Sequence, residues 1–350
     1  MGTVAKKLIA SGSVSGPYEA ITGQYTKGVG MGSGAVMGYD VTDIDNAVLT
    51  DTVTNSNLSY GFDGTTDPTR DLGFLANYST DGFSCVDFSD VTNVSVLDSV
   101  TSSTYYDLTK GCAVDTVGEI LYVSGFTPNY LSAIDYSTPT ALSRLGSVAT
   151  TNGGTKIVLD VARDTAFQLA AGARLQSFDI ADPTSMTELS ILTDSTAMST
   201  ASGLAIDTTR DLIFTSNYGN DSVSVLDTTT VSAVTVTSTL VDTVNLDRVQ
   251  QIAVDEGDEL AFCLGNRVLS VVDYSNTASL SVSDTISTAY FSTGYSRSVT
   301  VDKVRKLVFV KALNVGGIFV YDYSTPTALV LVKLIYSNAA PLFYLGGIAP

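Results

Sequence analysis

Short apolar runs that end in aspartate recur along the whole chain. Each run alternates apolar residues with small or polar ones, a pattern typical of a half-buried β-strand. Between Asp40 and Asp322 the terminal aspartates lie on average 47 residues apart. The seven runs are AVMGYD, FSCVD, LSAID, LQSFD, VSVLD, LSVVD and IFVYD, and they end at Asp40, Asp87, Asp135, Asp179, Asp227, Asp273 and Asp322. The sequence is therefore an internal repeat.

Each repeat predicts four short strands. The fifth copy is clearest, with strands expected over 203–207, 212–217, 222–227 and 233–240. These runs are rich in Val, Ile and Thr, whereas Asp, Asn, Gly and Thr between them favour turns, and no helical period is evident. A repeated four-stranded unit of this length is typical of a propeller blade. We predict an all-β fold, a seven-bladed β-propeller with four-stranded blades of about 47 residues.

Seven copies account for residues 18–337 and leave a segment at each end. Residues 4–13 have the pattern of a fourth strand, and residues 345–350 have that of a first strand. We therefore predict an N-terminal extra strand within 1–17, a C-terminal closing strand within 338–350, and no separate second domain. The two strands could close the ring within the chain or pair with a neighbouring subunit, and we favour closure within the chain.

Two motifs resemble known propeller repeats. Residues 213–227, IFTSNYGNDSVSVLD, resemble the YVTN-type repeat, and residues 178–184 and 321–327, FDIADPT and YDYSTPT, are similar to the LVIVD-type repeat. The similarity extends over roughly residues 18–336 and implies a propeller fold. It implies no single activity, because such repeats occur in surface proteins, lactonase-like enzymes and binding modules. The first copy of the repeat differs most from these repeat patterns, because GVGMGSG at 28–34 replaces the usual second strand.

Charge and composition narrow the possible functions. The formal net charge of −18 argues against binding to nucleic acid or to an anionic membrane through the general surface. The chain contains no histidine. This excludes a Ser-His-Asp triad, a histidine general base and histidine-ligated zinc or haem built from this chain alone. We expect no cofactor and no enzymatic activity.

The repeated aspartates are predicted to stabilise turns. Strand direction alternates within a blade, so the aspartates that end the first and third strands lie on one face of the ring. We interpret them as Asx-type turns, in which the carboxylate accepts backbone N–H bonds. Two acidic clusters on that face, residues 255–259 and Asp40 with Asp43 and Asp45, are an alternative Ca²⁺ site. Neither matches an EF-hand, and we predict no metal site.

The opposite face is predicted to carry aromatic and cationic residues. Four cations precede innermost strands, and tyrosines lie in the loops between blades. The predicted binding residues are Lys110, Lys156, Arg248, Arg297, Tyr105, Tyr106, Tyr290 and Tyr295. We expect the four cations to approach one another at the mouth of the central channel and to bind an acidic group, a glycan or a partner's loop. The alternative is that the aromatics pack between blades and the cations pair with carboxylates.

The remaining features concern location. Cys85, Cys112 and Cys263 lie in strand-like runs without metal-site spacing, and we expect buried free thiols. The chain shows no secretory signal and no continuous apolar span. Abundant Ser, Thr, Asn, Gly and Tyr favour an extracellular surface or a virion.

Three function classes remain open at this point. The favoured class is a non-enzymatic structural or adhesive surface protein, a virion component or a cell-surface appendage subunit, which uses a propeller face to bind protein or glycan. Other protein subunits, in a homo- or hetero-assembly, are its expected partners. The alternatives are a soluble scaffold for protein–protein interaction and a lactonase- or lyase-like enzyme.

Overall fold

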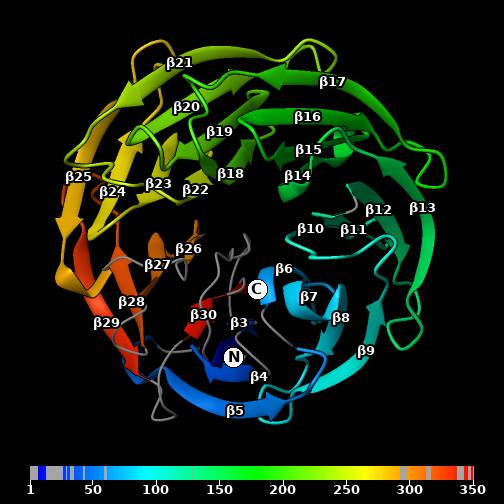
Figure 1. Ribbon diagram of the computed structural model, residues 1–350. Helices are drawn as coiled ribbons and strands as arrows, with labels where there is room; N and C mark the ends of the chain where they lie inside the picture. Colours follow the sequence, from blue (N-terminus) through cyan, green and yellow to red (C-terminus); the bar gives the residue numbers. More distant parts are fainter. Residues whose placement is uncertain are drawn as a thin grey trace.

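The chain folds into a ring of β-sheets (Figure 1). The structure is a computed structural model that describes residues 7–12, 27–28, 30–31, 35–41, 44–58, 61–127, 129–291, 298–312, 317–336, 343–345 and 348–349. The sheets are arranged around a common axis and the strands of each succeed one another outward, as the repeat predicts. Within the described residues, no helix has the length and apolar character needed to cross a bilayer.

Six regular blades make up most of the ring. Each is a four-stranded antiparallel sheet whose strands pair in sequence order. The first three blades consist of β6 (Gly61–Asp67), β7 (Leu72–Asn77), β8 (Gly82–Asp87), β9 (Ser95–Thr101); β10 (Gly111–Asp115), β11 (Ile120–Gly125), β12 (Tyr130–Asp135), β13 (Ser143–Ala149); and β14 (Gly154–Asp160), β15 (Thr165–Ala170), β16 (Arg174–Asp179), β17 (Thr187–Thr193).

The other three blades repeat this arrangement. They consist of β18 (Ala201–Asp207), β19 (Leu212–Asn217), β20 (Ser222–Asp227), β21 (Thr235–Val241); β22 (Gln251–Asp255), β23 (Leu260–Leu264), β24 (Val268–Asp273), β25 (Ser281–Ser287); and β26 (Ser298–Asp302), β27 (Leu307–Ala312), β28 (Gly317–Asp322), β29 (Val330–Tyr336). The propeller with four-stranded blades is thus confirmed, but the predicted number of seven blades is wrong.

The first sequence copy does not form a consecutive blade. Its third-strand run is β4 (Ala35–Asp40), which pairs with β5 (Val48–Thr54) on one side. On the other side β4 pairs with β1 (Lys7–Gly12) and with the two-residue β3 (Gly30–Met31). In the described part of the glycine-rich segment 28–34 the strands are only two residues long, which fits a residue with no side chain to pack and a high conformational entropy to lose.

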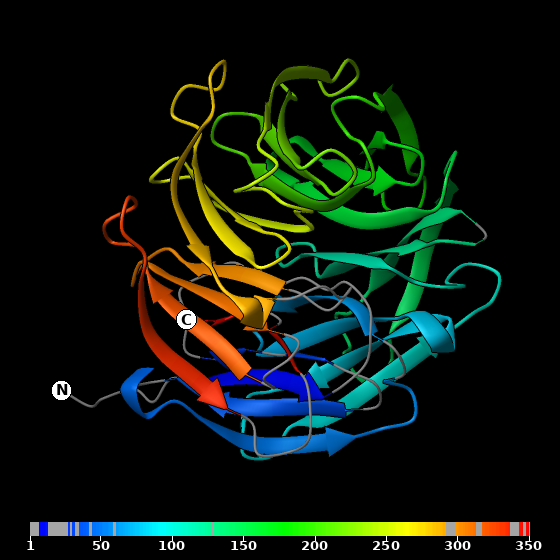
Figure 2. The same cartoon turned by 60° about the vertical axis from the view of Figure 1, so that its left-hand side comes forward.

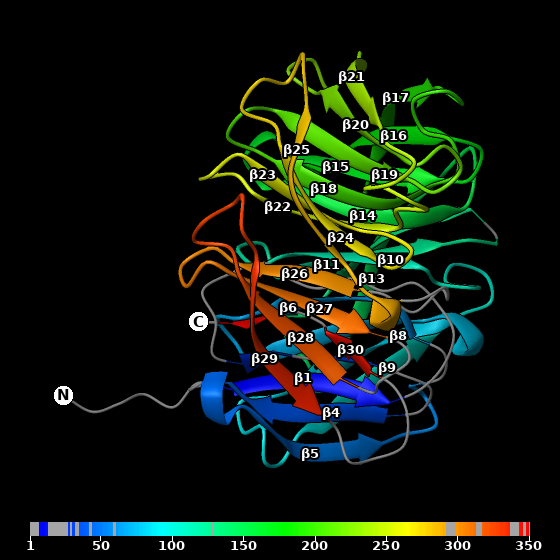
Figure 3. The ribbon, with the colours of Figure 1, turned by 90° about the vertical axis from the view of Figure 1, so that its left-hand side faces the viewer.

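The resulting five-stranded terminal sheet draws on both ends of the chain. β1 also pairs antiparallel with β30 (Phe343–Leu345), so that β1 lies between β4 and β30. The short β2 (Lys27–Gly28) pairs separately with β31 (Ile348–Ala349). Both partners of β1 belong to its own chain, and the terminal sheet lies between the β26–β29 and β6–β9 blades (Figures 1 and 3). The boundaries 1–17 and 338–350 stay predictions.

The terminal sheet contacts its neighbours as the regular blades contact theirs. The Arg305 guanidinium of the last blade donates to the Val41 carbonyl at 3.2 Å. On the other side, the Asp51 carboxylate of β5 accepts the Val94 N–H at 2.8 Å, as Asp98 of β9 accepts the Leu142 N–H at the same distance. Polar contacts therefore join the terminal sheet to the blades on both of its sides.

The apolar core lies between facing blades. In three junctions a phenylalanine of the second strand packs against a tyrosine that follows the third strand of the next blade, with ring centroids 4.5 to 4.7 Å apart. The pairs are Phe74 with Tyr136, Phe214 with Tyr274 and Phe262 with Tyr323, and all six rings are buried. The fourth strands form the exposed outer rim of the ring (Figure 2). Cys85, Cys112 and Cys263 are buried and free, as predicted.

The repeated aspartates form the predicted turns. Asp67 accepts the Thr69 N–H and Asp207 accepts the Thr209 N–H, both at 2.9 Å. After the third strands, Asp87 accepts the Ser89 N–H at 2.7 Å in the same manner. These carboxylates replace backbone acceptors that the tight connections lack. The recurrence of aspartate is thus a requirement of the turn.

The first-strand aspartates also join adjacent blades. The Tyr136 hydroxyl donates to Asp67 and the Tyr274 hydroxyl to Asp207, both at 3.1 Å, and the Tyr323 hydroxyl donates to Asp255 at 2.8 Å. The three carboxylates are buried, so each needs these donors to offset the loss of water.

Replacement of Tyr274 by phenylalanine tests this junction. Tyr274→Phe keeps the packed ring and removes one donor from the buried Asp207 carboxylate. We expect the free energy of unfolding to fall by about 1–2 kcal/mol in urea denaturation. Tyr218→Phe, in a half-buried turn, is the control and should change stability little. Equal stabilities for the two variants would contradict this role.

Deletion of residues 1–12 tests closure of the ring. It removes β1 and leaves the facing edges of β4 and β30 without their partner. We expect a monomer that melts at a lower temperature and unfolds at a lower urea concentration. A truncated monomer of full stability that has lost an oligomeric state would instead favour strand donation between subunits.

Candidate functional site

The predicted binding residues divide into buried, half-buried and exposed groups. Arg297 and Tyr295 lie outside the described residues, and their predicted roles stay predictions. Lys156 and Tyr106 are buried, Lys110 and Tyr105 are half-buried, and Arg248 and Tyr290 are exposed.

Lys156 lies in an ion pair inside the ring. Its Nζ is 3.0 Å from Oδ1 of Asp63, and both side chains are at most 2% exposed. The other oxygen of Asp63 accepts the Cys112 N–H at 3.1 Å. Because Asp63, Cys112 and Lys156 belong to β6, β10 and β14, this contact joins three consecutive blades. Lys156 is therefore not at a channel mouth where it could meet a ligand, as the prediction required.

Lys110 lies in a cage of three aromatic rings. Its Nζ is 3.3 Å from the ring centroid of Phe126, 5.1 Å from that of Phe62 and 5.4 Å from that of Tyr78. Phe62 is in β6, Tyr78 begins the short 3₁₀ helix η2 (Tyr78–Thr80), and Phe126 follows β11. We call these four residues the Lys110 cage. Burial lowers the pKa of Lys110 to about 8.

The local chain geometry places Lys110 in this cage. Lys110 directly precedes β10, and its N–H donates to the Ser124 carbonyl at 3.1 Å. The Asp107 carbonyl accepts the Phe126 N–H at 3.0 Å, which brings the two loops together. Starts of first strands and ends of second strands share one face of a propeller. The cage therefore lies on the face opposite the aspartate turns.

A second aromatic and cationic cluster lies in the same blade. Tyr105 makes edge-to-face contact with Tyr130 at 5.4 Å, and the Arg144 guanidinium lies 4.0 Å from the Tyr105 ring centroid. Tyr106 turns inward, where it contacts the Phe83 ring at 5.2 Å. We call Tyr105, Tyr130 and Arg144 the tyrosine–arginine cluster. Together with the Lys110 cage it forms the aromatic patch.

Arg248 and Tyr290 belong to other junctions. The Arg248 guanidinium lies 5.8 Å from the Tyr218 ring centroid, while its backbone N–H donates to Asp221 at 2.7 Å. Tyr290 is 52% exposed and stacks on Phe319 at 5.7 Å. The three described cations do not gather as the prediction required, because Lys156 is buried with Asp63 and Lys110 is held by aromatic rings.

Sequence reasoning missed five of the seven residues of the aromatic patch. Phe62, Tyr78, Phe126, Tyr130 and Arg144 were not among the predicted binding residues. One signal could have found the three cage rings: all lie in the loops or strand ends that share a face with Lys110. The buried Asp63 had no such signal, since its partner lies two blades away.

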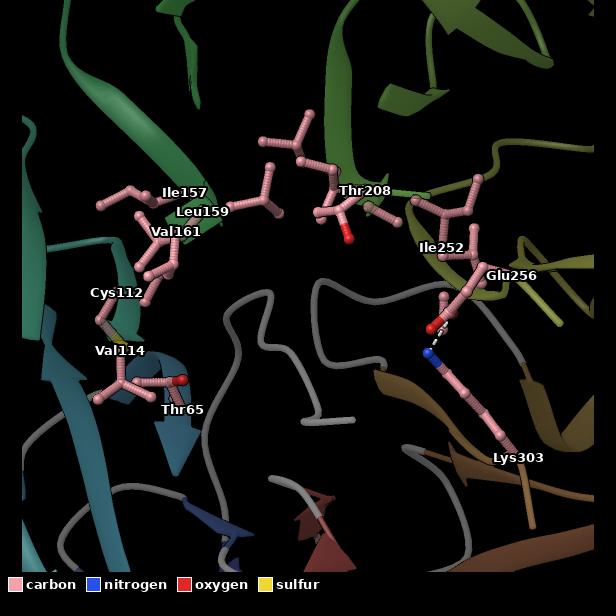
Figure 4. A pocket seen from close by; sticks show the side chains of 18 residues that line it. Thr65, Cys112, Val114, Ile157, Leu159, Val161, Thr208, Ile252, Glu256 and Lys303 are labelled. Atoms are coloured by element: carbon pink, nitrogen blue, oxygen red, sulfur yellow. Dashed lines mark hydrogen bonds and ion pairs between the residues drawn. The ribbon is translucent and has the colours of Figure 1, made fainter. Parts of the chain in front are cut away.

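The central channel has a lining of mixed polarity. A cavity of about 340 Å³ is lined by innermost strands, among them Val114, Ile157, Leu159 and Ile252 (Figure 4). Its charged lining residues, Glu256 and Lys303, form an ion pair with each other. Within the described lining we find no arrangement of a nucleophile with a general base.

The acidic cluster at 255–259 is neutralised by cations of neighbouring turns. Lys306 pairs with both Asp255 and Asp258, at 2.9 and 2.8 Å. Glu256 pairs with Lys303, and Glu259 accepts from Arg210 at 2.8 Å. Carboxylates held this way serve the junctions between blades. Asp43, of the other cluster, lies outside the described residues. The described residues contain no group of three or more Asp, Glu or Cys side chains placed to bind a metal ion.

Comparisons with known proteins show the fold alone. No protein-family model matches the chain, and no curated protein sequence matches it. The structure is similar to a Lactobacillus plantarum protein, with TM-score 0.74, 15% identity and coverage of 98% of this chain and 99% of that one. A functionally unknown protein from Desulfotomaculum acetoxidans gives TM-score 0.71 at 9% identity, covering 90% and 96%.

Two further solved structures carry functional names. The β-propeller domain of Myceliophteria thermophila Cps50 (Swd1) gives TM-score 0.58 at 9% identity, covering 78% of this chain and 86% of that one. A Bacteroides fragilis protein named as a candidate 6-phosphogluconolactonase gives a TM-score of 0.63 at 11% sequence identity, and the match covers 76% of this chain and 81% of that one. At these identities the likeness establishes a β-propeller and leaves the activity open.

The Asp63–Lys156 pair gives a prediction with a pH dependence. Lys156→Met leaves a buried carboxylate without its cation, which should cost about 3–5 kcal/mol of stability at neutral pH. Burial raises the pKa of Asp63 above its ordinary 3.8, so the folded state favours the protonated form. A group whose pKa is raised on folding stabilises the folded state at pH values below its unfolded pKa of 3.8, and this stabilisation is lost as the pH rises through the folded pKa. The loss of stability caused by Lys156→Met should therefore become smaller as the pH is lowered.

The measurement is urea denaturation at several pH values. Lys303→Met, in an ion pair whose two partners are half-buried, is the matched control and should cost about 1 kcal/mol or less. The double variant Asp63→Asn, Lys156→Met should recover stability at neutral pH. A deficit of Lys156→Met that does not change with pH would refute the assignment.

Proposed function

We propose that this protein is a non-enzymatic structural or adhesive surface protein, a virion component or a cell-surface appendage subunit, and that one propeller face binds protein or glycan. The observation that carries the proposal is the aromatic patch. Half-buried rings and cations gather there, with the Lys110 cage on the face opposite the aspartate turns and Arg144 reaching Tyr105 from the fourth strand β13.

The chemistry of the patch suits recognition. Tyrosine and arginine are enriched in binding hot spots, because they offer large contact areas together with polar groups. Arg144 is exposed, while Tyr105 and Tyr130 are half-buried and therefore partly open to a partner. A cationic patch on a chain of net charge −18 would attract an acidic or polar partner at short range.

The distribution of the other charges supports the aromatic patch as the binding site. On the aspartate face, Arg70, Arg210 and Lys306 are engaged in ion pairs between blades. The channel lining described above offers an ion pair and apolar side chains. The aromatic patch thus combines cations with partly open rings, and no ion pair with a described carboxylate is seen for Lys110 or Arg144.

Alanine substitution in the tyrosine–arginine cluster tests this function. We expect wild-type protein to bind one class of acidic or neutral glycan on a microarray, or to form a defined assembly in native mass spectrometry. Tyr105→Ala combined with Arg144→Ala should weaken that binding about tenfold or more, which corresponds to ~1.4 kcal/mol. The thermal stability should fall only slightly, since Arg144 is exposed.

Val117→Ala is the control on the opposite face, where Val117 is 88% exposed, and should bind as the wild type does. Equal binding by the double variant and the control would contradict a role of the patch. Hydrolysis of lactone substrates by the wild type, with or without added divalent metal ions, would contradict the non-enzymatic function.

A further inference from the structure

The Asp63–Lys156 pair brings an amine and a carboxyl group together inside the ring. Lys156 Nζ lies 3.0 Å from Oδ1 of Asp63, and the side chains of the lysine and the aspartate are 1% and 2% exposed. In the Glu256–Lys303 pair, by contrast, the side chains of the lysine and the glutamate are 26% and 33% exposed. Water therefore reaches the second pair and is kept from the first.

Equivalent positions of three first strands form this buried contact. Asp63, Gly111 and Lys156 each lie four residues before the aspartate that ends β6, β10 and β14. Gly111 thus lies in the strand between the two charged residues. A Cβ atom at Gly111 would lie 3.0 Å from Lys156 Cα and 2.8 Å from Ser124 Oγ, closer than Cβ atoms normally approach other atoms. The absence of a side chain here lets β14 lie close to β10.

The two oxygens of the Asp63 carboxyl group have different partners. Oδ2 accepts the Cys112 N–H at 3.1 Å, whereas Oδ1 faces the lysine amine. A backbone N–H aimed at a carbonyl oxygen stabilises the negative charge that develops there when a nucleophile adds to the carbon. The site therefore holds an amine beside one oxygen and a donor for an oxyanion at the other.

The location favours the uncharged form of the pair. Moving one proton from Nζ to Oδ1 along their contact converts the ammonium and the carboxylate into an amine and a carboxylic acid. Burial disfavours charged groups, because protein atoms replace water around them. In agreement with this, burial raises the pKa of Asp63 above its ordinary 3.8. The closed ring thus populates a free amine in contact with a protonated carboxyl group.

The channel cavity adjoins the pair. The residue after each of the three equivalent positions, Gly64, Cys112 and Ile157, lines this cavity of about 340 Å³ (Figure 4). A small molecule released by a reaction at the pair therefore has a space beside it.

We propose that Lys156 Nζ and Asp63 Cγ join in an intramolecular amide bond, which cross-links β14 to β6. Both partners belong to the chain, so no external reagent has to enter. Groups that a fold holds in contact react with effective concentrations of about 10⁵–10⁸ M, which favours a condensation that is slow between free molecules. The amide also replaces two buried charges, whose removal from water is costly. This inference is independent of the glycan- or protein-binding function proposed above.

The reaction balances without an oxidant or a cofactor. In the uncharged pair the lone pair of Nζ forms a bond to Cγ, and the carbonyl π electrons move to Oδ2, where the Cys112 N–H stabilises the charge. A proton passes from nitrogen to the Oδ1 hydroxyl, which leaves as water while the electrons on Oδ2 restore the carbonyl. The net reaction converts one ammonium and one carboxylate into one amide and one water molecule.

Intact-mass spectrometry of the full chain tests the proposal. After prolonged incubation, the folded protein should be lighter than its sequence mass by one water molecule. Peptide mapping by tandem mass spectrometry should then find a branched peptide that joins Lys156 to Asp63. A succinimide at Asp63–Gly64 would have the same mass without a branch, so a lost water without the branched peptide overturns the proposal. A mass that stays at the sequence value shows an ion pair only and overturns it as well.

Three variants separate the chemistry from the folding. Lys156→Arg keeps the cation but cannot form this bond, and it should keep its sequence mass. Lys303→Arg, in the half-buried pair with Glu256, is the matched control and should lose one water as the wild type does. Gly111→Ala keeps both reacting groups but places a methyl group against Lys156, so we expect cross-linking to be about tenfold slower or more.

The variants also give results that would overturn the proposal. Loss of water by Lys156→Arg would place the reaction elsewhere in the chain. Equal rates for Gly111→Ala and the wild type would contradict a reaction that depends on the close approach of β10 and β14. The wild-type peptide map decides the proposal even where a variant does not fold.

Discussion

A buried carboxylate that must receive hydrogen bonds from two directions underlies the whole ring. Asp207 ends an innermost strand and is fully buried, so it needs donors in place of water. Its own turn supplies the Thr209 N–H, and the next blade supplies the Tyr274 hydroxyl. The same group thus shapes the turn and fixes the distance to the next blade. The same requirement recurs at Asp67 and Asp255, so three pairs of adjacent blades are joined in the same way.

The charges of the protein are distributed according to this constraint. On the aspartate face, arginines reach the following blade, as Arg210 does to Glu259, whereas Lys303 and Lys306 reach the preceding blade. The charged side chains on that face therefore stabilise the contacts between blades. The cations of the aromatic patch, Lys110 and Arg144, contact aromatic rings and form no ion pair with a described carboxylate. The proposed binding function is based on this difference between the two faces in how their cations are paired.

Much of the fold could be predicted from local patterns. The strands, the aspartate turns and the buried cysteines depend on residues close together in the sequence, and they were predicted correctly. The number of blades was not, because one aspartate-ended run was counted as a blade although its partner strands come from both ends of the chain. The position of Lys156 was predicted wrongly for a related reason, because only the closed ring brings its carboxylate partner Asp63 near.

The same distinction applies to the candidate site. The face on which Lys110 lies follows from strand alternation, which is a local property. The rings that enclose it come from β6, η2 and the loop after β11, and their convergence depends on how two blades pack. A cation that precedes an innermost strand can end in an ion pair or against aromatic rings, and only the tertiary packing decides between them.

The pairing of β1 with β30 has a consequence for the order of folding. β1 is made early during synthesis and β30 late, so the contact between them has one of the largest sequence separations in the chain. Regular blades can form from local hairpins as the chain emerges, whereas the terminal sheet must wait for translation to reach β30. Until then the edge of β1 stays unpaired and open to aggregation. A circular permutant that joins the present ends and opens the chain in a turn between regular blades would make this contact local, and should refold faster.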